Sequence, residues 1–135
     1  MLDIRRIRTE GDEVKKRLLK RGRSHDREID DILALDGKRR DLLHQCEQLK
    51  AEQNAANKKI PEIKRAGGDA APVFKALKDL SNRIKALELD ATAAEEALFT
   101  LLLALPNTPD PSVPDGADSD DNKEIRRVGE PRNFG

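Results

Sequence analysis

Two short groups of side chains in this sequence have the residue types of a reaction centre. Ser24-His25-Asp26 has the letters of a hydrolytic triad. Three adjacent residues on a capping turn cannot point at one reacting atom, so the sequence predicts a helix cap here. His44 and Cys46 lie close in sequence but have no further His or Cys at metal-ligand spacing. We expect His44 to be solvated and Cys46 to be a buried small hydrophobe.

A third group, of basic residues with two asparagines, could bind a polyanion. Residues 50–85 hold nine basic and four acidic residues, a net charge of +5, although the whole chain has 26 of each. The competing interpretation is the solvated face that any charged helix carries. Phe74 is the sole aromatic nearby, so stacking on bases cannot dominate, and contacts with phosphates and with the shape of a folded RNA are expected. The candidate residues are Asn54, Asn57, Lys58, Lys59, Lys64, Arg65, Lys75, Lys78, Arg83 and Lys85.

These candidates stand between the members of two runs of apolar residues that have coiled-coil spacing. One run, within residues 32–63, includes Arg39 and Gln53 as polar members, which must reach solvent or find polar partners. The other, within residues 73–105, has no polar member, and the short segment between them contains Gly67 and Gly68. The sequence therefore predicts an all-α fold, a long antiparallel two-helix coiled-coil hairpin, in a register that brings Leu49 to Leu87.

The expected helical arm covers residues 1–105. It divides into a short N-terminal helical unit at the base of the hairpin (1–26), a first long helix (27–63), a tip turn (64–71) and a second long helix (72–105). Thr9, followed by acidic residues, resembles the cap of the N-terminal helix. Pro61 predicts a stop or kink of the first long helix near Lys59. The N-terminal unit is expected to cover the apolar residues at the open end of the hairpin.

Residues 106–135 are rich in proline and aspartate, which predicts an irregular tail or linker. Residues 124–128 could form a short strand, but the chain offers no sheet to pair with it. A single cysteine excludes an internal disulfide, and neither a signal peptide nor an 18-residue apolar stretch is present. These features predict a soluble cytoplasmic protein without a membrane partner.

Several segments resemble the amino-terminal domain of bacterial-type seryl-tRNA synthetases. In the helical part, the similar segments are residues 1–4, 14–22, 32–40 and 49–54. In the tail, they are residues 105–109, 113–116, 121–122 and 126–132, which resemble the segment that joins this family's arm to its catalytic domain. Pro61 and residues 70–72 depart from the lysine-rich continuous helices common in the family, and Val128 stands where an aromatic residue is frequent.

The resemblance implies an arm that binds the elbow and long variable arm of serine tRNA, in a homodimer whose other subunit holds that tRNA. It also implies a catalytic domain after the linker, in a parent serine–tRNA ligase that uses ATP and Mg²⁺. No segment here matches the family's catalytic, cofactor or metal residues, so the chain alone is not expected to be an enzyme. The alternative function is a structural or adaptor coiled coil that acts by protein–protein association.

Overall fold

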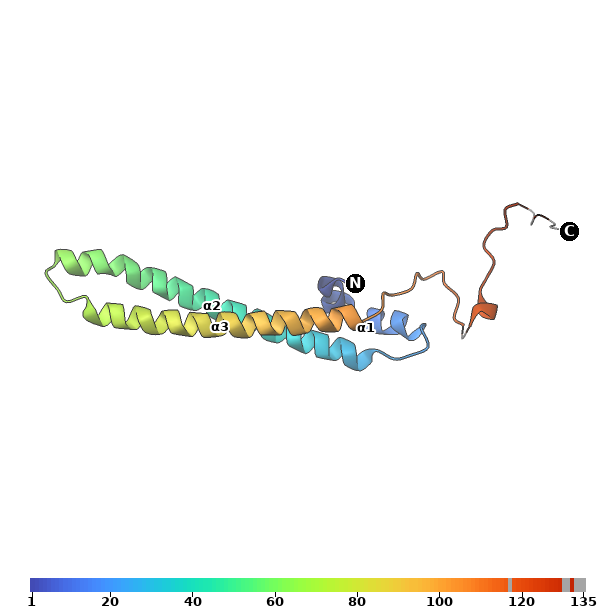
Figure 1. Cartoon of the computed structure of the whole chain (residues 1–135), viewed down its shortest axis with the longest axis horizontal. Coiled ribbons are helices and arrows are strands. Elements are labelled where there is room, and N and C mark those ends of the chain that lie inside the picture. Colours follow the sequence, from blue (N-terminus) through green and yellow to red (C-terminus); the bar gives the residue numbers. More distant parts are fainter. Residues whose placement is uncertain (117, 130–131, 133–135) are drawn as a thin grey trace.

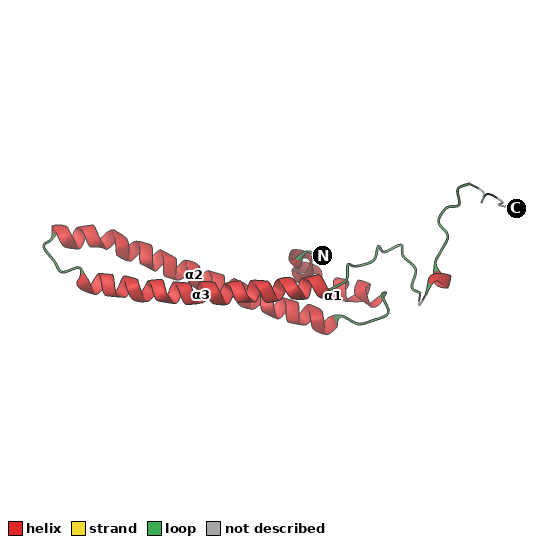
Figure 2. Ribbon diagram, in the orientation of Figure 1, coloured by secondary structure: helices red, strands yellow, loops and turns green. Residues whose placement is uncertain are grey.

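The computed structural model describes residues 1–116, 118–129 and 132, and three α-helices dominate it (Figure 1). They are α1 (Ile4–Leu19), α2 (Asp26–Arg65) and α3 (Ala71–Ala104). Helices α2 and α3 run antiparallel as a long hairpin, α1 lies at its open end, and the tail leads away from that end. The described residues form helices and loops and no strand (Figure 2). The predicted all-α hairpin is confirmed.

The seam of the hairpin is held by small apolar clusters. Cys46 and Leu49 of α2 are buried with Ile84 of α3, and Leu80 and Leu87 pack against them. Leu49 and Leu87 therefore share one cluster, as the predicted register requires. Cys46 is free and buried, which confirms its expected role as a small apolar side chain.

A larger cluster at the base joins all three helices. Because α1 is only 16 residues long, it depends on this contact with the hairpin for its stability. The expected packing of the N-terminal unit on the open end is therefore present. The buried members are Leu2, Ile7, Val14, Leu18, Ile29, Ile32, Leu98, Leu102 and Leu105.

Helix α1 begins earlier than its sequence suggested. Asp3 is the N-cap, and its Oδ1 accepts a hydrogen bond of 2.8 Å from the Arg5 N–H. The expected cap at Thr9 is wrong, because the Thr9 hydroxyl donates backward to the Arg5 carbonyl at 3.1 Å. Glu10 has non-helical backbone angles (φ −129°, ψ 32°), which kinks α1 just after Thr9. The acidic residues after Thr9 thus follow a kink inside α1.

Pro61 does not end α2, so of the predicted stop or kink near Lys59 the stop is wrong. The helix continues through Pro61 to Arg65. Proline cannot donate to the carbonyl of Asn57, but both residues are exposed, so water can satisfy that carbonyl. The lost hydrogen bond lies away from the seam, where Ile60 and Ile63 keep their half-buried positions.

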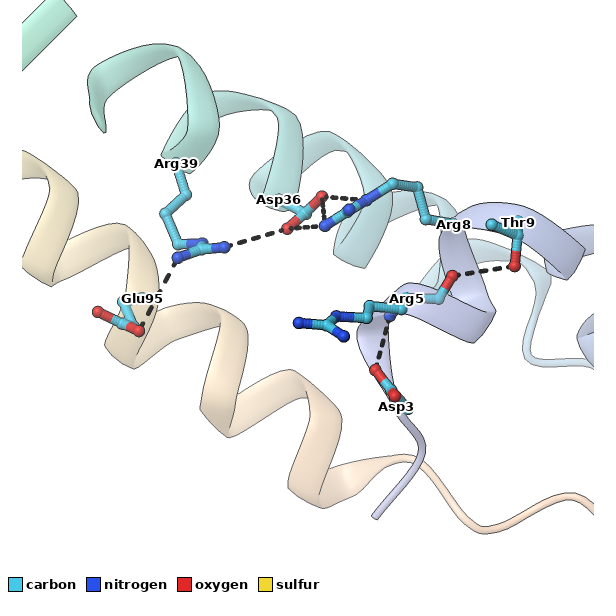
Figure 3. Close-up of polar contacts among 7 residues, drawn as sticks. All are labelled: Asp3, Arg5, Arg8, Thr9, Asp36, Arg39 and Glu95. Carbon is cyan, nitrogen blue, oxygen red and sulfur yellow. Dashed lines mark hydrogen bonds and ion pairs between the residues drawn. The ribbon is translucent and has the colours of Figure 1, made fainter. Parts of the chain in front are cut away.

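A polar network connects the three helices near the base (Figure 3). Arg8 of α1 donates to both carboxylate oxygens of Asp36 on α2, at 3.0 and 3.1 Å. Arg39 lies 3.6 Å from Asp36 and 3.9 Å from Glu95 of α3. Arg39, a polar member of the apolar run within residues 32–63, was expected to reach solvent or find polar partners, and Asp36 and Glu95 are such partners.

The start of the tail is held by basic side chains in the last turn of α1 and in the two residues after it. Arg17, Lys20 and Arg21 donate to carbonyl groups of the tail, so the path of residues 107–113 is tied to the base. The acceptors are Pro109 for Arg17 (2.5 Å), Val113 for Lys20 (3.3 Å) and Asn107 for Arg21 (2.8 Å).

Farther along the tail, Ser119–Asp121 form one 3₁₀ turn, and residues 124–128 are irregular rather than a strand. Ala117, Glu130, Pro131 and residues 133–135 of the expected linker lie outside the described residues. No helix in the described ranges is long and apolar enough to span a bilayer.

Candidate nucleic-acid interface

The end of α2 is shaped by backbone hydrogen bonds and one glycine. The N–H of Ala66 donates to the Glu62 carbonyl and that of Gly68 to the Ile63 carbonyl, both at 3.0 Å. Gly67 has a φ of +70°, a left-handed conformation that residues with a Cβ rarely adopt. This capping pattern ends α2 and turns the chain back.

Helix α3 starts directly after this turn. Asp69 Oδ1 accepts a hydrogen bond of 2.9 Å from the Ala71 N–H, and Ala70 is buried under the turn. Pro72 lies in the first turn of α3, where a missing N–H costs no helical hydrogen bond. Residues 66–70 alone therefore connect the helices, and the basic ends of α2 and α3 lie side by side at one tip (Figure 1).

The structure brings the ten candidate residues together along the distal half of the hairpin. All ten residues are exposed, and none of them packs in the seam between α2 and α3. Six lie on α2, namely Asn54, Asn57, Lys58, Lys59, Lys64 and Arg65. Four lie on α3, namely Lys75, Lys78, Arg83 and Lys85.

The candidate cations differ from the cations at the base in their partners. At the base, Arg8, Lys15 and Arg23 form ion pairs with Asp36, Asp30 and Glu28 respectively. Within residues 1–116, 118–129 and 132, none of the eight candidate Lys and Arg side chains forms an ion pair. The tip charge is thus not neutralised by those residues and remains available to an external anion.

Two contacts across the hairpin were not foreseen from the sequence. Lys64 Nζ of α2 lies 5.8 Å from the centre of the Phe74 ring on α3. Lys50 Nζ lies 2.7 Å from Glu88 Oε1, and this hydrogen bond raises the pKa of Lys50. Lys50 and Glu88 directly follow Leu49 and Leu87 in sequence, so the predicted register contained the signal for their pairing. The charge of Lys50 is therefore partly neutralised by Glu88 within the chain.

The short triad-like sequence is a helix cap, as expected. Ser24 Oγ accepts a hydrogen bond of 3.3 Å from the Asp26 N–H, and His25 occupies the N-cap position of α2. His44 is exposed, and its Nε2 lies 3.1 Å from Nε2 of Gln48. Among the described residues, no group of three or more His, Cys, Asp or Glu side chains could hold a metal ion.

Comparisons with known proteins identify relatives along almost the whole chain. The sequence is 45% identical over 134 residues to a serine–tRNA ligase of Alkaliphilus oremlandii (strain OhILAs), covering 99% of this chain and 31% of that protein. It is 44% identical over 134 residues to a serine–tRNA ligase of Nitratidesulfovibrio vulgaris (strain DSM 19637 / Miyazaki F), with the same coverage. The chain thus spans about a third of the length of these relatives.

A solved structure has the same fold. The crystal structure of seryl-tRNA synthetase from Pyrococcus horikoshii complexed with ATP matches with a TM-score of 0.84 and 32% sequence identity. The match covers 96% of this chain and 29% of that one. The family described as the seryl-tRNA synthetase N-terminal domain matches residues 1–109. With its hairpin, its base helix and this match over most of its length, the chain belongs to the family of seryl-tRNA synthetase N-terminal domains.

Proposed function

We propose that this chain is the tRNA-binding arm of a serine–tRNA ligase. The arm contacts the elbow and the long variable arm of serine tRNA through phosphates and through the shape of the folded RNA. The observation that carries this proposal is the concentration of exposed cations, without ion-pair partners among the described residues, at the hairpin tip. Backbone phosphates are the natural partners of such cations, because binding releases condensed counterions from the RNA.

The fold supports this role by holding the tip away from the base. Helix α3 has 34 residues, so at 1.5 Å per residue it spans about 50 Å. A continuous seam with buried Leu49, Ile84 and Leu98 stiffens the hairpin over that distance. An arm of this kind can reach the outer part of a tRNA while its base stays with the rest of the enzyme.

The parent protein, in this proposal, is a homodimeric cytoplasmic enzyme that joins serine to its tRNA with ATP and Mg²⁺. The relatives carry the name serine–tRNA ligase, and the solved relative contains ATP. The described residues of this chain contain no group of three or more His, Cys, Asp or Glu side chains that could hold a metal ion, so they do not fit a Mg²⁺ site. The reaction would belong to a catalytic domain that follows the linker, and the arm alone would position tRNA without catalysing the reaction.

A filter-binding titration of the 135-residue chain tests the proposal. Serine tRNA should bind more tightly than a tRNA without a long variable arm, and affinity should fall steeply as salt rises. Equal affinity for the two RNAs, or affinity that salt does not change, would refute the proposed recognition. Absence of serine-dependent ATP–pyrophosphate exchange by the pure chain would agree with its silence as an enzyme, whereas detectable exchange would contradict it.

One observation favours the adaptor function as a second candidate. Leu89, Phe99 and Leu103 of α3 are exposed apolar side chains outside the seam. A second copy of the chain could cover them, although the seam itself is already satisfied within one chain. Sedimentation separates the two functions: a monomer that binds RNA supports the arm, and an obligate oligomer without RNA affinity supports the adaptor.

A further inference from the structure

The two long edges of the distal hairpin have different chemistry. On α2, positions 50, 54, 57, 61 and 64 recur at alternating steps of four and three, which keeps them on one side of the helix. On α3, positions 74, 78, 81, 85 and 88 do the same. The Lys64–Phe74 contact joins these rows at the tip, and the Lys50–Glu88 ion pair joins them at the other end. The two rows therefore border one and the same edge of the hairpin.

We call this edge the Phe74 flank. It carries four lysines and a single acidic residue, a net charge of +3. Side chains able to donate hydrogen bonds lie between the charges, and half of the Phe74 surface is exposed (50%). Its members are Lys50, Asn54, Asn57, Pro61 and Lys64 on α2, and Phe74, Lys78, Ser81, Lys85 and Glu88 on α3.

The opposite flank is close to neutral. A shallow groove there is lined from both helices by Glu52, Ala55, Ala56, Lys59, Pro72, Val73 and Ala76. Helical spacing adds Glu62 of α2 and Asp79 and Arg83 of α3 to the same side. Two cations then stand against three carboxylates, a net charge of −1. Of the ten candidate residues, only Lys59 and Arg83 lie on this opposite flank.

We propose that RNA lies along the Phe74 flank and that the opposite flank faces away from it. The inference rests on the proposed function and assigns that function to one side of the arm. Phosphates follow the row Lys64, Lys78 and Lys85, because a row of like charges without interspersed carboxylates gives the deepest attraction for a polyanion. Phe74 lies within this row and offers its exposed ring surface to a base or a ribose. Carboxylates on the opposite flank repel the same polyanion.

A matched pair of double variants tests this assignment. Lys64→Gln with Lys78→Gln neutralises two exposed cations on the Phe74 flank, and Lys59→Gln with Arg83→Gln neutralises two on the opposite flank. Each pair takes one residue from α2 and one from α3, and each lowers the net charge equally. The measurement is the affinity for a serine tRNA transcript as a function of salt, with circular dichroism melts to show that the fold is unchanged.

The Phe74-flank pair should weaken binding about tenfold or more and should lower the slope of log affinity against log salt by roughly 1.4 to 1.8. The opposite-flank pair should weaken binding less than about threefold, through long-range attraction alone. Equal losses in the two pairs, or a larger loss in the opposite-flank pair, overturn the assignment. Lack of binding by the unmodified chain instead defeats the proposed function, so the two failures are distinguishable.

Cross-linking gives a direct second readout. A photo-crosslinker attached to Ser81→Cys stands on the Phe74 flank, and one attached to Ala55→Cys stands on the opposite flank, both in a Cys46→Ala background. The label at position 81 should cross-link to serine tRNA at low salt at least about five times more strongly than the label at position 55, because only the former lies beside phosphates. Equal yields, or a higher yield at position 55, contradict the assignment.

Discussion

Arg8 of α1 donates two parallel hydrogen bonds to Asp36 of α2, from Nε to Oδ2 at 3.0 Å and from Nη2 to Oδ1 at 3.1 Å. The Asp36 side chain is only 3% exposed, and two cations lie beside it, Arg8 and, at 3.6 Å, Arg39. The pair joins residues 28 positions apart and attaches the base helix to the hairpin.

Replacing Arg8 with Met should therefore destabilise the chain. The change leaves the buried carboxylate with Arg39 as its one remaining cation, at 3.6 Å. We expect a loss of about 2 kcal/mol in the free energy of unfolding, reduced from the cost of a fully buried pair because Arg8 is about a third exposed. Urea denaturation at neutral pH measures the loss. Arg5→Met is the control, since the Arg5 side chain forms no ion pair with the described residues, and a loss as large as that of Arg8→Met would disprove the role of the pair.

Pro61→Ala should stabilise the hairpin, in contrast to Pro72→Ala. Alanine at position 61 restores the N–H that can donate to the Asn57 carbonyl, and the gain of roughly 3 kcal/mol in helix propensity is partly offset by a more flexible unfolded chain. We expect a net gain of about 2 kcal/mol. Pro72 lies in the first turn of α3, so its replacement should be neutral or slightly destabilising. Paired urea melts decide, and a loss of stability in Pro61→Ala would show that the proline is required.

Phe74→Ala should weaken binding of serine tRNA, whereas Phe99→Ala should not. The two phenylalanines lie on α3 with similar exposure, 50% and 52%, but only Phe74 is at the tip. Loss of a contact between a base and an aromatic ring costs about 1 to 3 kcal/mol, which corresponds to a fall in affinity of roughly five- to 150-fold. Fluorescence anisotropy of labelled tRNA measures both variants. If Phe74→Ala binds like the unmodified chain, the ring does not contact RNA.

Asp110 should titrate below its ordinary pKa of 3.8, because Ser112 donates to its Oδ1 from both the hydroxyl at 2.7 Å and the backbone N–H at 2.9 Å. A lowered pKa means that this turn is stabilised above pH 3.8 and that the stabilisation is lost as the pH falls through the lower, folded value. Carboxyl NMR titration of the chain measures the pKa of Asp110. Ser112→Ala should raise that pKa toward 3.8, and Ser24→Ala, at another cap, should leave it unchanged.

The sequence predicted the parts of the fold that repeat. The apolar ladders of α2 and α3 extend over many turns, so the seam, the register around Leu49 and Leu87, and the burial of Cys46 followed from spacing. Single-residue signals were less reliable. Pro61 was expected to stop or kink α2, but α2 continues through it, because Pro61 lies on a solvated side where the lost hydrogen bond is tolerated. Thr9 was expected to cap the N-terminal helix, but Asp3 is the N-cap and the Thr9 hydroxyl donates backward to the Arg5 carbonyl.

The positions of the candidate residues in the fold could be predicted in part. Local composition located the basic tip, because net charge over 36 residues does not depend on side-chain direction. The division into two flanks needed contacts across the hairpin, namely Lys64 with Phe74 and Lys50 with Glu88. Without them, Lys59 and Arg83 looked equivalent to Lys64 and Lys78. The hydrogen bonds from Arg17, Lys20 and Arg21 to residues 107–113 had no periodic signal in the sequence.

The packing of the base cluster of α1, α2 and α3 determines where the distant tip lies, which matters for the proposed RNA binding. The tip stands about 50 Å from that cluster, so a rotation of only 5° at the base would displace it by roughly 4 Å, more than the length of a hydrogen bond. A substitution at Ile7 or Leu102 could thus misplace Lys64 without touching it. The accuracy with which the arm presents its lysines is set by apolar packing at the far end of the molecule.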